Sequence, residues 1–329
     1  MPFNATPTYL ITAASGNIGR HLIHHLFYNH DKATIVLPTN NPDRLQEQLG
    51  SIANNSRVKV VHGNIQEPGF IEATLKSHNV TAAFICLSGE NELIVTMNLF
   101  DAIKRSGTVK HLVYLSGCGN YDLDAIRAGG IRDNWAGNTL VKHIIEAKLR
   151  YGTPPRNQPG GFSWTILGPS QFFSNDYRSK EAMLKNGFFN EPLGNKGVSR
   201  VDTRDIALAA ANALRDDGQV WGRKKVMIGS LETYTIVDIA KLWSEALGTE
   251  ITAAKSDEEG LATFEGHFKP FIGPVLARSI TLMYKGFDAN RFGMNEAEYE
   301  DQVALLGKAP ASYKEFVKTT AQEWKNGSG

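Results

Sequence analysis

The chain has 329 residues, of which 42% are hydrophobic and 21% are charged, so a largely disordered protein is excluded because enough apolar material exists for a sizeable core. The 35 basic and 34 acidic residues nearly cancel, which argues against DNA or an anionic membrane as the main partner. Two cysteines are too few for a secreted disulfide scaffold, and neither a signal peptide nor an apolar run of roughly 20 residues is present, so we expect a cytoplasmic protein.

Short β-rich runs alternate with helical patterns through the first half of the chain. The predicted strands are apolar runs bounded by polar turns, and they cover 8–12, 33–37, 58–61, 82–87, 111–115 and 163–167. The predicted helices have apolar residues at helical spacing, and they cover 16–29, 43–49, 68–77, 92–106 and 140–151. Strands separated by helices need crossover connections, so the pattern predicts an α/β fold with a Rossmann-like, doubly wound parallel sheet.

The alternation weakens beyond Gly168. Helices are predicted over 205–214, 236–247 and 312–324. The hydrophobic pattern of 255–300 shows no clear helical or strand periodicity. Because ligands of doubly wound sheets bind beyond the carboxyl ends of the strands, the loops that follow the strands are the places to look for a site.

The turn after the first predicted strand, TAASGNIG at 12–19, favours dinucleotide binding. Small residues let the backbone approach a pyrophosphate, and the N-terminus of the following helix offers N–H groups and a positive dipole end. Gly16 and Gly19 hold two of the three glycine positions of this fingerprint, and Ala13 stands at the first. An ordinary tight turn between strand and helix is the alternative.

The second predicted strand indicates which nicotinamide cofactor is bound. No acid stands at its end, near Asn40, to bind the ribose hydroxyls of NAD. Arg44 follows shortly after, and Arg20 lies in the first helix; either guanidinium is a bidentate donor for a 2′-phosphate. We therefore predict NADP(H), with solvated surface arginines as the alternative.

Several segments occur in an order that is more specific than any one of them. They are ITAASGNIG at 11–19, a helix with Asn98 after the fourth strand, HLVYLSG at 111–117, VKHIIEAKLRYG at 141–152, FSWTILGPSQFFSN at 162–175, VDTRDIALAAANAL at 201–214 and TYTIVDIAKLWSEALGTEI at 233–251. In this order they resemble the NmrA-like family of atypical short-chain dehydrogenases. The resemblance implies a dinucleotide-binding core over 1–168, which a later segment from about residue 198 to residue 230 rejoins. Residues 169–329 would otherwise form mostly a smaller C-terminal α/β substrate lobe.

The resemblance also implies which residues meet the dinucleotide. Residues 15–18 would lie along the pyrophosphate, Arg44 would replace an arginine that relatives often carry at Asn40, and Asn64 falls where an acid commonly meets the adenine. The full set of implied cofactor residues is Thr12, Ala13, Ser15, Gly16, Asn17, Ile18, Asn40, Arg44, Asn64, Leu87, Ser88, Lys142 and Phe172.

Ordinary short-chain dehydrogenases use Tyr-x-x-x-Lys, in which the lysine lowers the tyrosine pKa and the tyrosine transfers the proton. Lys142 matches the lysine, but Asn138 stands at the tyrosine position, so the usual general acid is missing. We predict that Lys142 binds the nicotinamide ribose and is catalytic. The resemblance implies that Ser116 assists, since its counterpart in relatives polarises the substrate carbonyl or touches the nicotinamide. An exposed helix lysine and a turn-forming serine are the alternatives.

The family segment beside the nicotinamide implies an apolar substrate pocket. The residues that we expect to shape it are Cys118, Tyr121, Trp135, Phe173, Asn175 and Tyr177. Core packing is the alternative for the aromatic residues. We expect no metal site, since the histidines of the first helix, His21 and His25 among them, have no further ligands at suitable spacing.

These observations predict an oxidoreductase. It would be an NADPH-dependent reductase that transfers hydride to a small, mostly apolar organic acceptor, a C=O, C=N or conjugated C=C, in secondary metabolism. Two alternatives remain: an NADP(H)-binding, redox-sensing regulator without turnover, and an isomerase or cyclase without net redox change. The expected partner is a small-molecule substrate rather than nucleic acid or a membrane, and both a monomer and a homodimer stay open.

Overall fold

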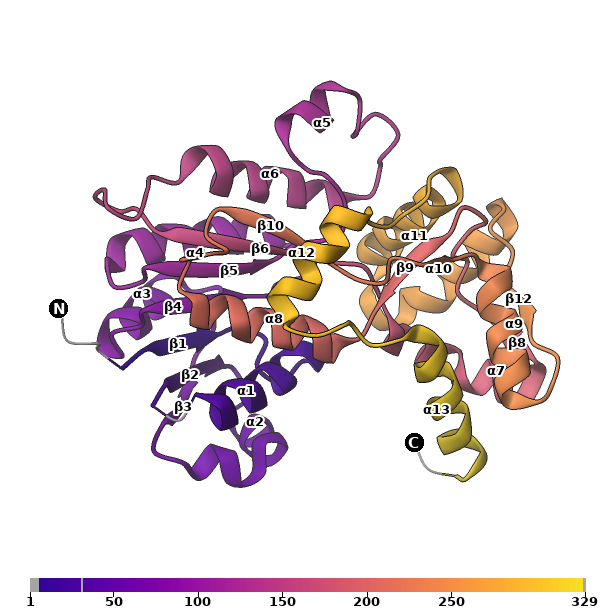
Figure 1. Ribbon diagram of the computed structural model, residues 1–329, viewed down its shortest axis with the longest axis horizontal. Coiled ribbons are helices and arrows are strands. Elements are labelled where there is room, and N and C mark those ends of the chain that lie inside the picture. Colours follow the sequence, from indigo (N-terminus) through magenta and orange to yellow (C-terminus); the bar gives the residue numbers. More distant parts are fainter. Residues whose placement is uncertain (1–5, 31, 328–329) are drawn as a thin grey trace. The chain divides into compact units, whose positions relative to one another are not determined.

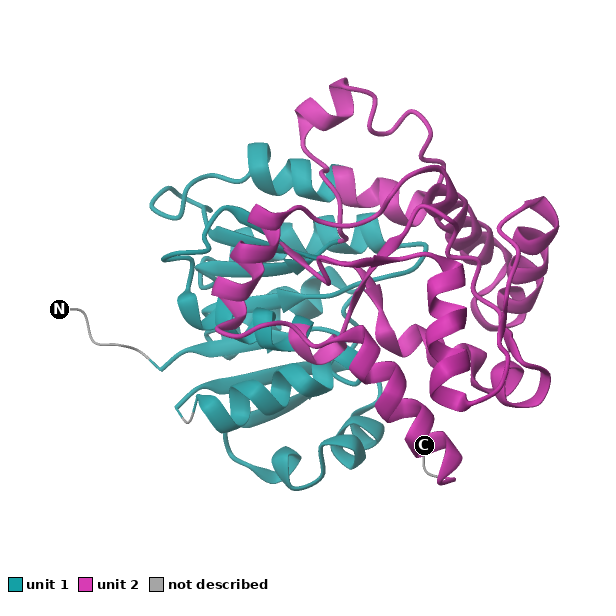
Figure 2. Ribbon diagram, turned by 45° about the vertical axis from the view of Figure 1, so that its right-hand side comes forward, with its two compact units in different colours: residues 1–116, 144–168, 206–226 teal, residues 117–143, 169–205, 227–329 magenta. Residues whose placement is uncertain are grey.

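The computed structural model describes residues 6–30 and 32–327, and the chain divides into two compact units, which Figure 2 colours separately. Unit 1 comprises 1–116, 144–168 and 206–226, and unit 2 comprises 117–143, 169–205 and 227–329. These boundaries differ from the predicted ones. Residues 117–143 belong to unit 2, and the segment that returns to the Rossmann core is 206–226 rather than about 198–230.

Unit 1 is built on a seven-stranded sheet with the order β10-β6-β5-β4-β1-β2-β3. The strands are β1 (Thr8–Ile11), β2 (Thr34–Thr39), β3 (Val58–His62), β4 (Ala82–Ile85), β5 (His111–Leu115), β6 (Ser163–Pro169) and β10 (Lys224–Ile228). All pairs from β3 across to β6 are parallel, which confirms the predicted fold class. The chain reverses its winding direction between β1 and β4, so their carboxyl ends form the topological switch point where such sheets bind ligands.

Helices cover both faces of this sheet (Figure 1). On one face, α3 (Pro68–Ser77), α4 (Glu92–Ser106) and the second half of α6 (Gly137–Gly152) pack against alternate strand residues such as Leu112 and Trp164. On the other face lie α1 (Asn17–Asn29), α2 (Pro42–Leu49) and α8 (Thr203–Asp216), and the short 3-10 helix η1 (Gly50–Asn54) follows α2. Burial on both faces explains why these strands are continuous apolar runs in the sequence.

Unit 2 combines short strands with a helical layer; its three segments together are not shorter than those of unit 1, so it is not the smaller lobe that was predicted. Strands β7 (Gln171–Phe172), β9 (Val198–Val201) and β11 (Thr233–Tyr234) form one sheet, and β8 (Phe188–Phe189) pairs with β12 (Thr252–Ala253). Its helices are α5 (Leu123–Arg127), the 3-10 helix η2 (Phe173–Ser179), α7 (Lys180–Asn186), α9 (Ile236–Leu247), α10 (Glu258–Ile272), α11 (Pro274–Ala289), α12 (Glu296–Leu306) and α13 (Tyr313–Lys325).

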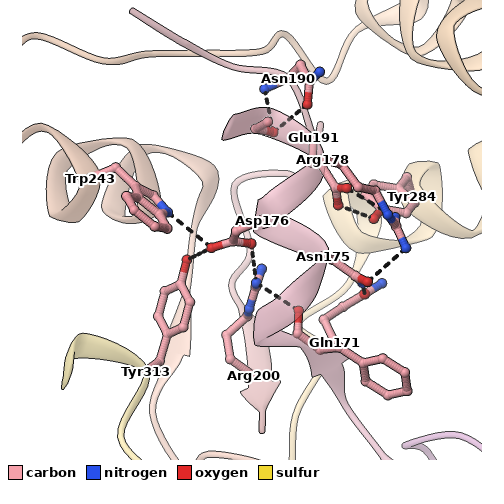
Figure 3. Close-up of polar contacts among 12 residues, drawn as sticks. Gln171, Asn175, Asp176, Arg178, Asn190, Glu191, Arg200, Trp243, Tyr284 and Tyr313 are labelled. Atoms are coloured by element: carbon pink, nitrogen blue, oxygen red, sulfur yellow. Dashed lines mark hydrogen bonds and ion pairs between the residues drawn. The ribbon is translucent and has the colours of Figure 1, made fainter. Parts of the chain in front are cut away.

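A buried ion pair lies at the centre of unit 2 (Figure 3). Asp176 and Arg200 are almost completely buried and contact each other through one carboxylate oxygen and one guanidinium nitrogen. The second carboxylate oxygen of Asp176 accepts hydrogen bonds from the indole N–H of Trp243, at 3.1 Å, and from the hydroxyl of Tyr313. These contacts join η2, β9, α9 and the start of α13.

A second buried acid lies beside the first. Glu191 accepts hydrogen bonds from the guanidinium of Arg178, at 3.1 Å, and from the hydroxyl of Tyr284 on α11. Burial raises the pKa of Glu191, and the charge of Arg178 opposes that rise. Each of these two buried carboxylates therefore contacts an arginine and a phenol.

Acid is expected to destabilise unit 1 through His111, the first residue of β5. Burial lowers the pKa of His111 to about 4, with Asp217 and Asp216 opposing the shift and Arg156 adding to it. In the unfolded chain the pKa is near the ordinary value of about 6.5, so between these values the unfolded state binds a proton that the folded state does not. The stability is therefore complete above about pH 6.5 and decreases by up to about 3 kcal/mol as the pH falls to 4.

Chemical unfolding at a series of pH values from 7 to 4 measures how the free energy of unfolding changes with pH. His111→Gln is the comparison variant, because glutamine can replace the 3.3 Å contact between the imidazole Nε2 and the Thr165 hydroxyl without titrating. We expect wild type to lose stability relative to the variant as the pH falls from 7 to 4. A constant difference over that range would contradict the prediction.

Candidate functional site

The turn after β1 has the backbone geometry of a dinucleotide fingerprint. Ala13 has a φ of 52°, in the left-handed region that favours glycine, so an alanine here keeps the conformation of the first fingerprint glycine. A Cβ on Gly19 would lie 2.3 Å from the carbonyl oxygen of Ala13, so α1 packs directly on the turn. The N-cap is Gly16, which has no side chain to cap the 13-residue helix. The first N–H groups of α1 therefore suit an anion, and the turn fits a dinucleotide pyrophosphate.

The predicted residues of this turn differ in accessibility. Ser15 and Asn17 are exposed, whereas Ile18 is buried in unit 1. Thr12 is completely buried, and its hydroxyl oxygen lies 3.2 Å from the Phe84 carbonyl and accepts a hydrogen bond of 2.8 Å from the Cys86 N–H. The prediction that Thr12 contacts the cofactor is therefore wrong for its side chain, because this hydroxyl joins β1 to β4 at the switch point.

The other predicted cofactor residues of unit 1 follow neighbouring parallel strands. Asn40 follows β2, Asn64 follows β3, and Leu87 and Ser88 follow β4. Asn40, Asn64 and Ser88 are exposed and Leu87 is half-buried. The strand order places them at one edge of the sheet, beside the fingerprint turn. Their contact with a cofactor stays a prediction.

The two arginines that favour NADP(H) are both exposed on unit 1. Arg44 lies in the first turn of α2, where its backbone N–H donates to the side-chain oxygen of Asn41, the N-cap, at 3.1 Å. Arg20 lies in α1, and its guanidinium donates to Asn17 at 3.3 Å. Because β1 and β2 are parallel neighbours, α1 and α2 begin at the same edge of the sheet. Contact of either arginine with a ribose phosphate stays a prediction.

Ser116 lies at the end of β5 in a buried charge cluster. The carboxylate of Glu146 on α6 has no exposed surface, and its Oε1 accepts hydrogen bonds from the Ser116 hydroxyl and from Lys225 Nζ, both at 2.6 Å. Its Oε2 accepts a third hydrogen bond from Arg150 at 3.2 Å. The Ser116 hydroxyl donates to Glu146 in this structure, so its contact with a substrate carbonyl or with the nicotinamide stays a prediction.

The position of the usual general acid is occupied by a side chain that does not titrate. Asn138, in the first turn of α6, accepts a hydrogen bond of 2.8 Å from the Ser279 hydroxyl, and its amide nitrogen lies 3.5 Å from the sulfur of Met283. These contacts hold the amide against α11. Lys142, one turn further along α6, is half-buried.

Unit 2 contains a cavity of about 410 Å³, a size that suits a small organic molecule. Cys118 and Tyr121 line it, together with His143, a residue that the sequence analysis missed. The Tyr121 hydroxyl donates to the Cys118 carbonyl at 2.9 Å, and the ring centroids of Tyr121 and His143 are 4.3 Å apart. Met283 and Phe292 add apolar surface from α11 and the segment after it. Substrate contact by Cys118 and Tyr121 stays a prediction.

The other three predicted aromatic residues lie elsewhere in unit 2. Phe173 is buried in the core, where its ring packs against Tyr313 and Phe316, so its predicted place in a pocket wall is wrong. Trp135 and Tyr177 are 73% and 48% exposed, which does not fit side chains that enclose an apolar ligand. Aromatic composition alone did not separate core, surface and cavity residues.

The 3-10 helix η2, which contains Asn175, is held by polar contacts (Figure 3). Asn175 donates to Gln171 at 2.9 Å and accepts from Arg178 at 2.8 Å. The neighbouring Phe172 is half-buried, and its carbonyl accepts a hydrogen bond of 3.1 Å from the buried Arg200. Asn175 and Phe172 thus belong to the framework of unit 2.

Two features are absent from the described chain, residues 6–30 and 32–327. No group of three or more His, Cys, Asp or Glu side chains in it could hold a metal ion. None of its helices has the length and apolar character that a membrane span requires.

Known proteins resemble this chain in sequence and in structure. An NAD(P)H azoreductase of Xenophilus azovorans is 28% identical over 268 residues, which cover 81% of this chain and 77% of that protein. The NADPH complex of an Escherichia coli NADPH-dependent quinone oxidoreductase has a TM-score of 0.74 at 18% identity and covers 95% of this chain and 99% of its own. A variant of NmrA has a TM-score of 0.65 at 16% identity and covers 98% of each chain.

The sequence model of the family described as NAD(P)H-binding matches residues 13–217, which include Gly16 and Gly19 of the fingerprint turn and strands β2 to β6. That match spans more than half of the chain. The chain therefore belongs to the NAD(P)H-binding family and has the NmrA-like fold that its sequence predicted.

Proposed function

We propose that this chain is an NADPH-dependent reductase of a small, mostly apolar organic acceptor with a C=O, C=N or conjugated C=C bond, as used in secondary metabolism. The observation that carries the proposal is the fingerprint turn at the switch point of unit 1, where the backbone of Ala13 and the packing of Gly19 leave the start of α1 open to a pyrophosphate. The reductase names of the azoreductase and of the quinone oxidoreductase support it.

Each part of the cofactor has candidate ligands in this chain. Residues 15–18 and the N-terminus of α1 would bind the pyrophosphate, and Asn64 would bind the adenine. Arg44 would bind the 2′-phosphate, and Lys142 would bind the nicotinamide ribose. When bound, the nicotinamide supplies a hydride. The cavity of unit 2 would bind the acceptor, with Tyr121 and Phe292 as apolar surface.

The direct test mixes the purified protein with NADPH and follows nicotinamide absorbance and fluorescence, first alone and then with a panel of enones, quinones, azo compounds and iminium ions. We expect saturable NADPH binding and oxidation that depends on the acceptor. Binding without turnover on any acceptor would favour the redox-sensing regulator. Product formation without NADPH consumption would favour an isomerase or cyclase, and absence of binding would overturn the cofactor assignment.

The preference for NADPH is expected to depend on Arg44. Arg44→Ala removes a charge-assisted hydrogen bond to the 2′-phosphate and should weaken NADPH binding by about 10- to 100-fold while leaving NADH binding unchanged. Titrations of both dinucleotides, followed by fluorescence, give the two Kd values. Arg127→Ala, which removes an exposed arginine paired with Asp124 in unit 2, is the control. Equal NADPH and NADH affinities in the wild type would contradict this role of Arg44.

Lys142→Met is expected to lower kcat by about 100-fold and to weaken NADPH binding, because it removes the ammonium that would orient the nicotinamide ribose. Lys148→Met, at an exposed position of the same helix, is the control and should behave like the wild type. Steady-state kinetics with the best acceptor of the panel measure both effects. A folded Lys142→Met variant with the full rate would show that Lys142 has no catalytic role.

A further inference from the structure

We propose that unit 1 has a second binding site, for a small organic phosphate, at the edge of the sheet opposite the fingerprint turn. The site is a cavity of about 680 Å³ at the amino ends of β1, β4 and β5, and this volume suits a small organic ligand. These strands are parallel, so their amino ends share one edge of the sheet, and the fingerprint turn lies at the other edge. The cavity lies within unit 1, and ligand binding there does not depend on the proposed reductase activity.

The cavity is lined by more positive than negative charge. Its described lysine and arginine side chains come from four separate segments of unit 1, and they are Lys32, Lys110, Arg156 and Arg215. Asp217 is the one acidic side chain in the described lining, and Arg156 donates to its carboxylate at 2.7 Å and to its backbone carbonyl at 2.9 Å. Helices α1, α4 and α8 also end at this edge, and each adds about half a negative charge, so an excess of about one to two positive charges remains.

Three of these cations are available to bind an anion. Arg215, in the last turn of α8, and Lys32, after α1, are exposed and form no ion pair with any side chain of residues 6–30 and 32–327. Lys110 donates one hydrogen bond of 2.7 Å to the carbonyl of Gly107, and two of the three ammonium protons remain. A guanidinium fork matches the spacing of phosphate oxygens, and the two ammonium groups add charge without a fixed geometry.

A buried phenol in the cavity wall indicates a ligand independently of the charges. Tyr9, the second residue of β1, is 3% exposed and lines the cavity, yet its hydroxyl has no hydrogen-bond partner in the described chain. Buried hydroxyls are nearly always hydrogen-bonded, so this one is expected to donate to a group from outside the chain. Burial raises the pKa of Tyr9 to about 12, with Asp217 adding to the rise and Arg215 opposing it. The hydroxyl therefore keeps its proton at neutral pH and lies within the field of Arg215.

The cavity also has apolar surface that suits an organic body. Pro7, Leu214 and the ring of Tyr9 line it, and the centroid of the His30 ring lies 5.7 Å from that of Tyr9. Inorganic phosphate would contact the cations and the hydroxyl and leave this surface unused. A phosphate on an aromatic or aliphatic body would bury it as well, and that burial adds affinity.

Calorimetric titration with phenyl phosphate tests this site, since the probe joins an aromatic ring to a phosphate and has neither adenine nor nicotinamide. We expect saturable binding that is about 10-fold or more tighter than binding of inorganic phosphate. Arg215→Ala should weaken binding of the probe by about 10- to 100-fold. Tyr9→Phe should weaken it by about 10-fold without lowering the Tm of the ligand-free protein, because the hydroxyl that it removes has no partner in residues 6–30 and 32–327.

Arg44→Ala is the matched control, since it removes an exposed arginine of unit 1 at the opposite edge of the sheet. Neither this variant nor saturating NADPH should change the affinity for phenyl phosphate. Weaker binding to Arg44→Ala, or displacement of the probe by NADPH, would overturn the proposal and assign the probe to the dinucleotide site. Equal affinities for phenyl phosphate and inorganic phosphate would overturn the ligand class.

Two further results would also overturn the proposal: absence of phenyl phosphate binding, and wild-type affinity in both Tyr9→Phe and Arg215→Ala. A protein that bound phenyl phosphate with the expected dependence on Tyr9 and Arg215 but did not bind NADPH would contradict the proposed function alone. The two proposals therefore fail on different measurements.

Discussion

Arg200→Met is expected to lower the free energy of unfolding by about 3–5 kcal/mol, because it removes the cation from a buried ion pair and leaves the Asp176 carboxylate without its counter-charge. The side chains of Asp176 and Arg200 are 0% and 1% exposed, so water cannot take over the lost interaction. Trp243 and Tyr313 would still donate to the carboxylate, but neither carries a charge. Thermal and urea unfolding, followed by tryptophan fluorescence, measure the loss.

The control is another arginine–aspartate pair of unit 2. The Arg204 side chain, paired with Asp202, is 66% exposed, so Arg204→Met should cost no more than about 1 kcal/mol. Adding Asp176→Asn to Arg200→Met should restore part of the stability, because it removes the uncompensated charge. If Arg200→Met and Arg204→Met lowered the free energy of unfolding equally, the prediction that burial makes the Arg200–Asp176 pair more important for stability would be contradicted.

Most of the framework of unit 1 could be predicted from the sequence, because helices cover both faces of its sheet (Figure 1). The central strands β1, β4 and β5 are therefore buried throughout and form largely apolar runs. Strand β10 was not predicted, since it begins with Lys224 and Lys225. The predicted bounds 68–77, 92–106 and 111–115 agree with α3, α4 and β5 residue by residue. The central elements therefore follow from local pattern alone.

Unit 2 was harder to predict for two physical reasons. Its strands β7, β8, β11 and β12 have two residues each, too few for an alternating pattern to appear. In α10 only Leu261 and Phe264 are buried, and Pro270 lies within the helix, so the helical period is weak. The break before α11 depends on Gly273, whose φ of 79° ends one helix as Pro274 starts the next.

The partners of the site residues could not be predicted, because they come from distant positions in the chain. Glu146 and Lys225 are 79 residues apart in sequence, and their contact determines the direction of the Ser116 hydroxyl. Asn138 is held by Ser279, which lies 141 residues further along. Sequence motifs identified residue types at strand ends, but the role of each residue depends on contacts that only the folded chain makes.

Gly19→Ala is expected to weaken NADPH binding by about 100-fold and to destabilise unit 1 by about 1–3 kcal/mol. The added Cβ would lie 2.3 Å from the Ala13 carbonyl oxygen and 2.9 Å from the Cα of Ala14. Both are backbone atoms of the fingerprint turn, so no side-chain rotation relieves the overlap, and α1 or the turn must move. That movement shifts the N–H groups that would bind the pyrophosphate.

Gly266→Ala is the matched control, since a Cβ on this glycine of α10 meets no atom within 4 Å. Alanine is favoured over glycine inside a helix by about 1 kcal/mol, so this variant should be slightly more stable and bind NADPH as the wild type does. Fluorescence titration with NADPH and thermal unfolding of both variants separate loss of binding from loss of fold. If a folded Gly19→Ala protein bound NADPH with wild-type affinity, the pyrophosphate could not lie on this turn, and the cofactor site would have to be sought at the ends of other strands.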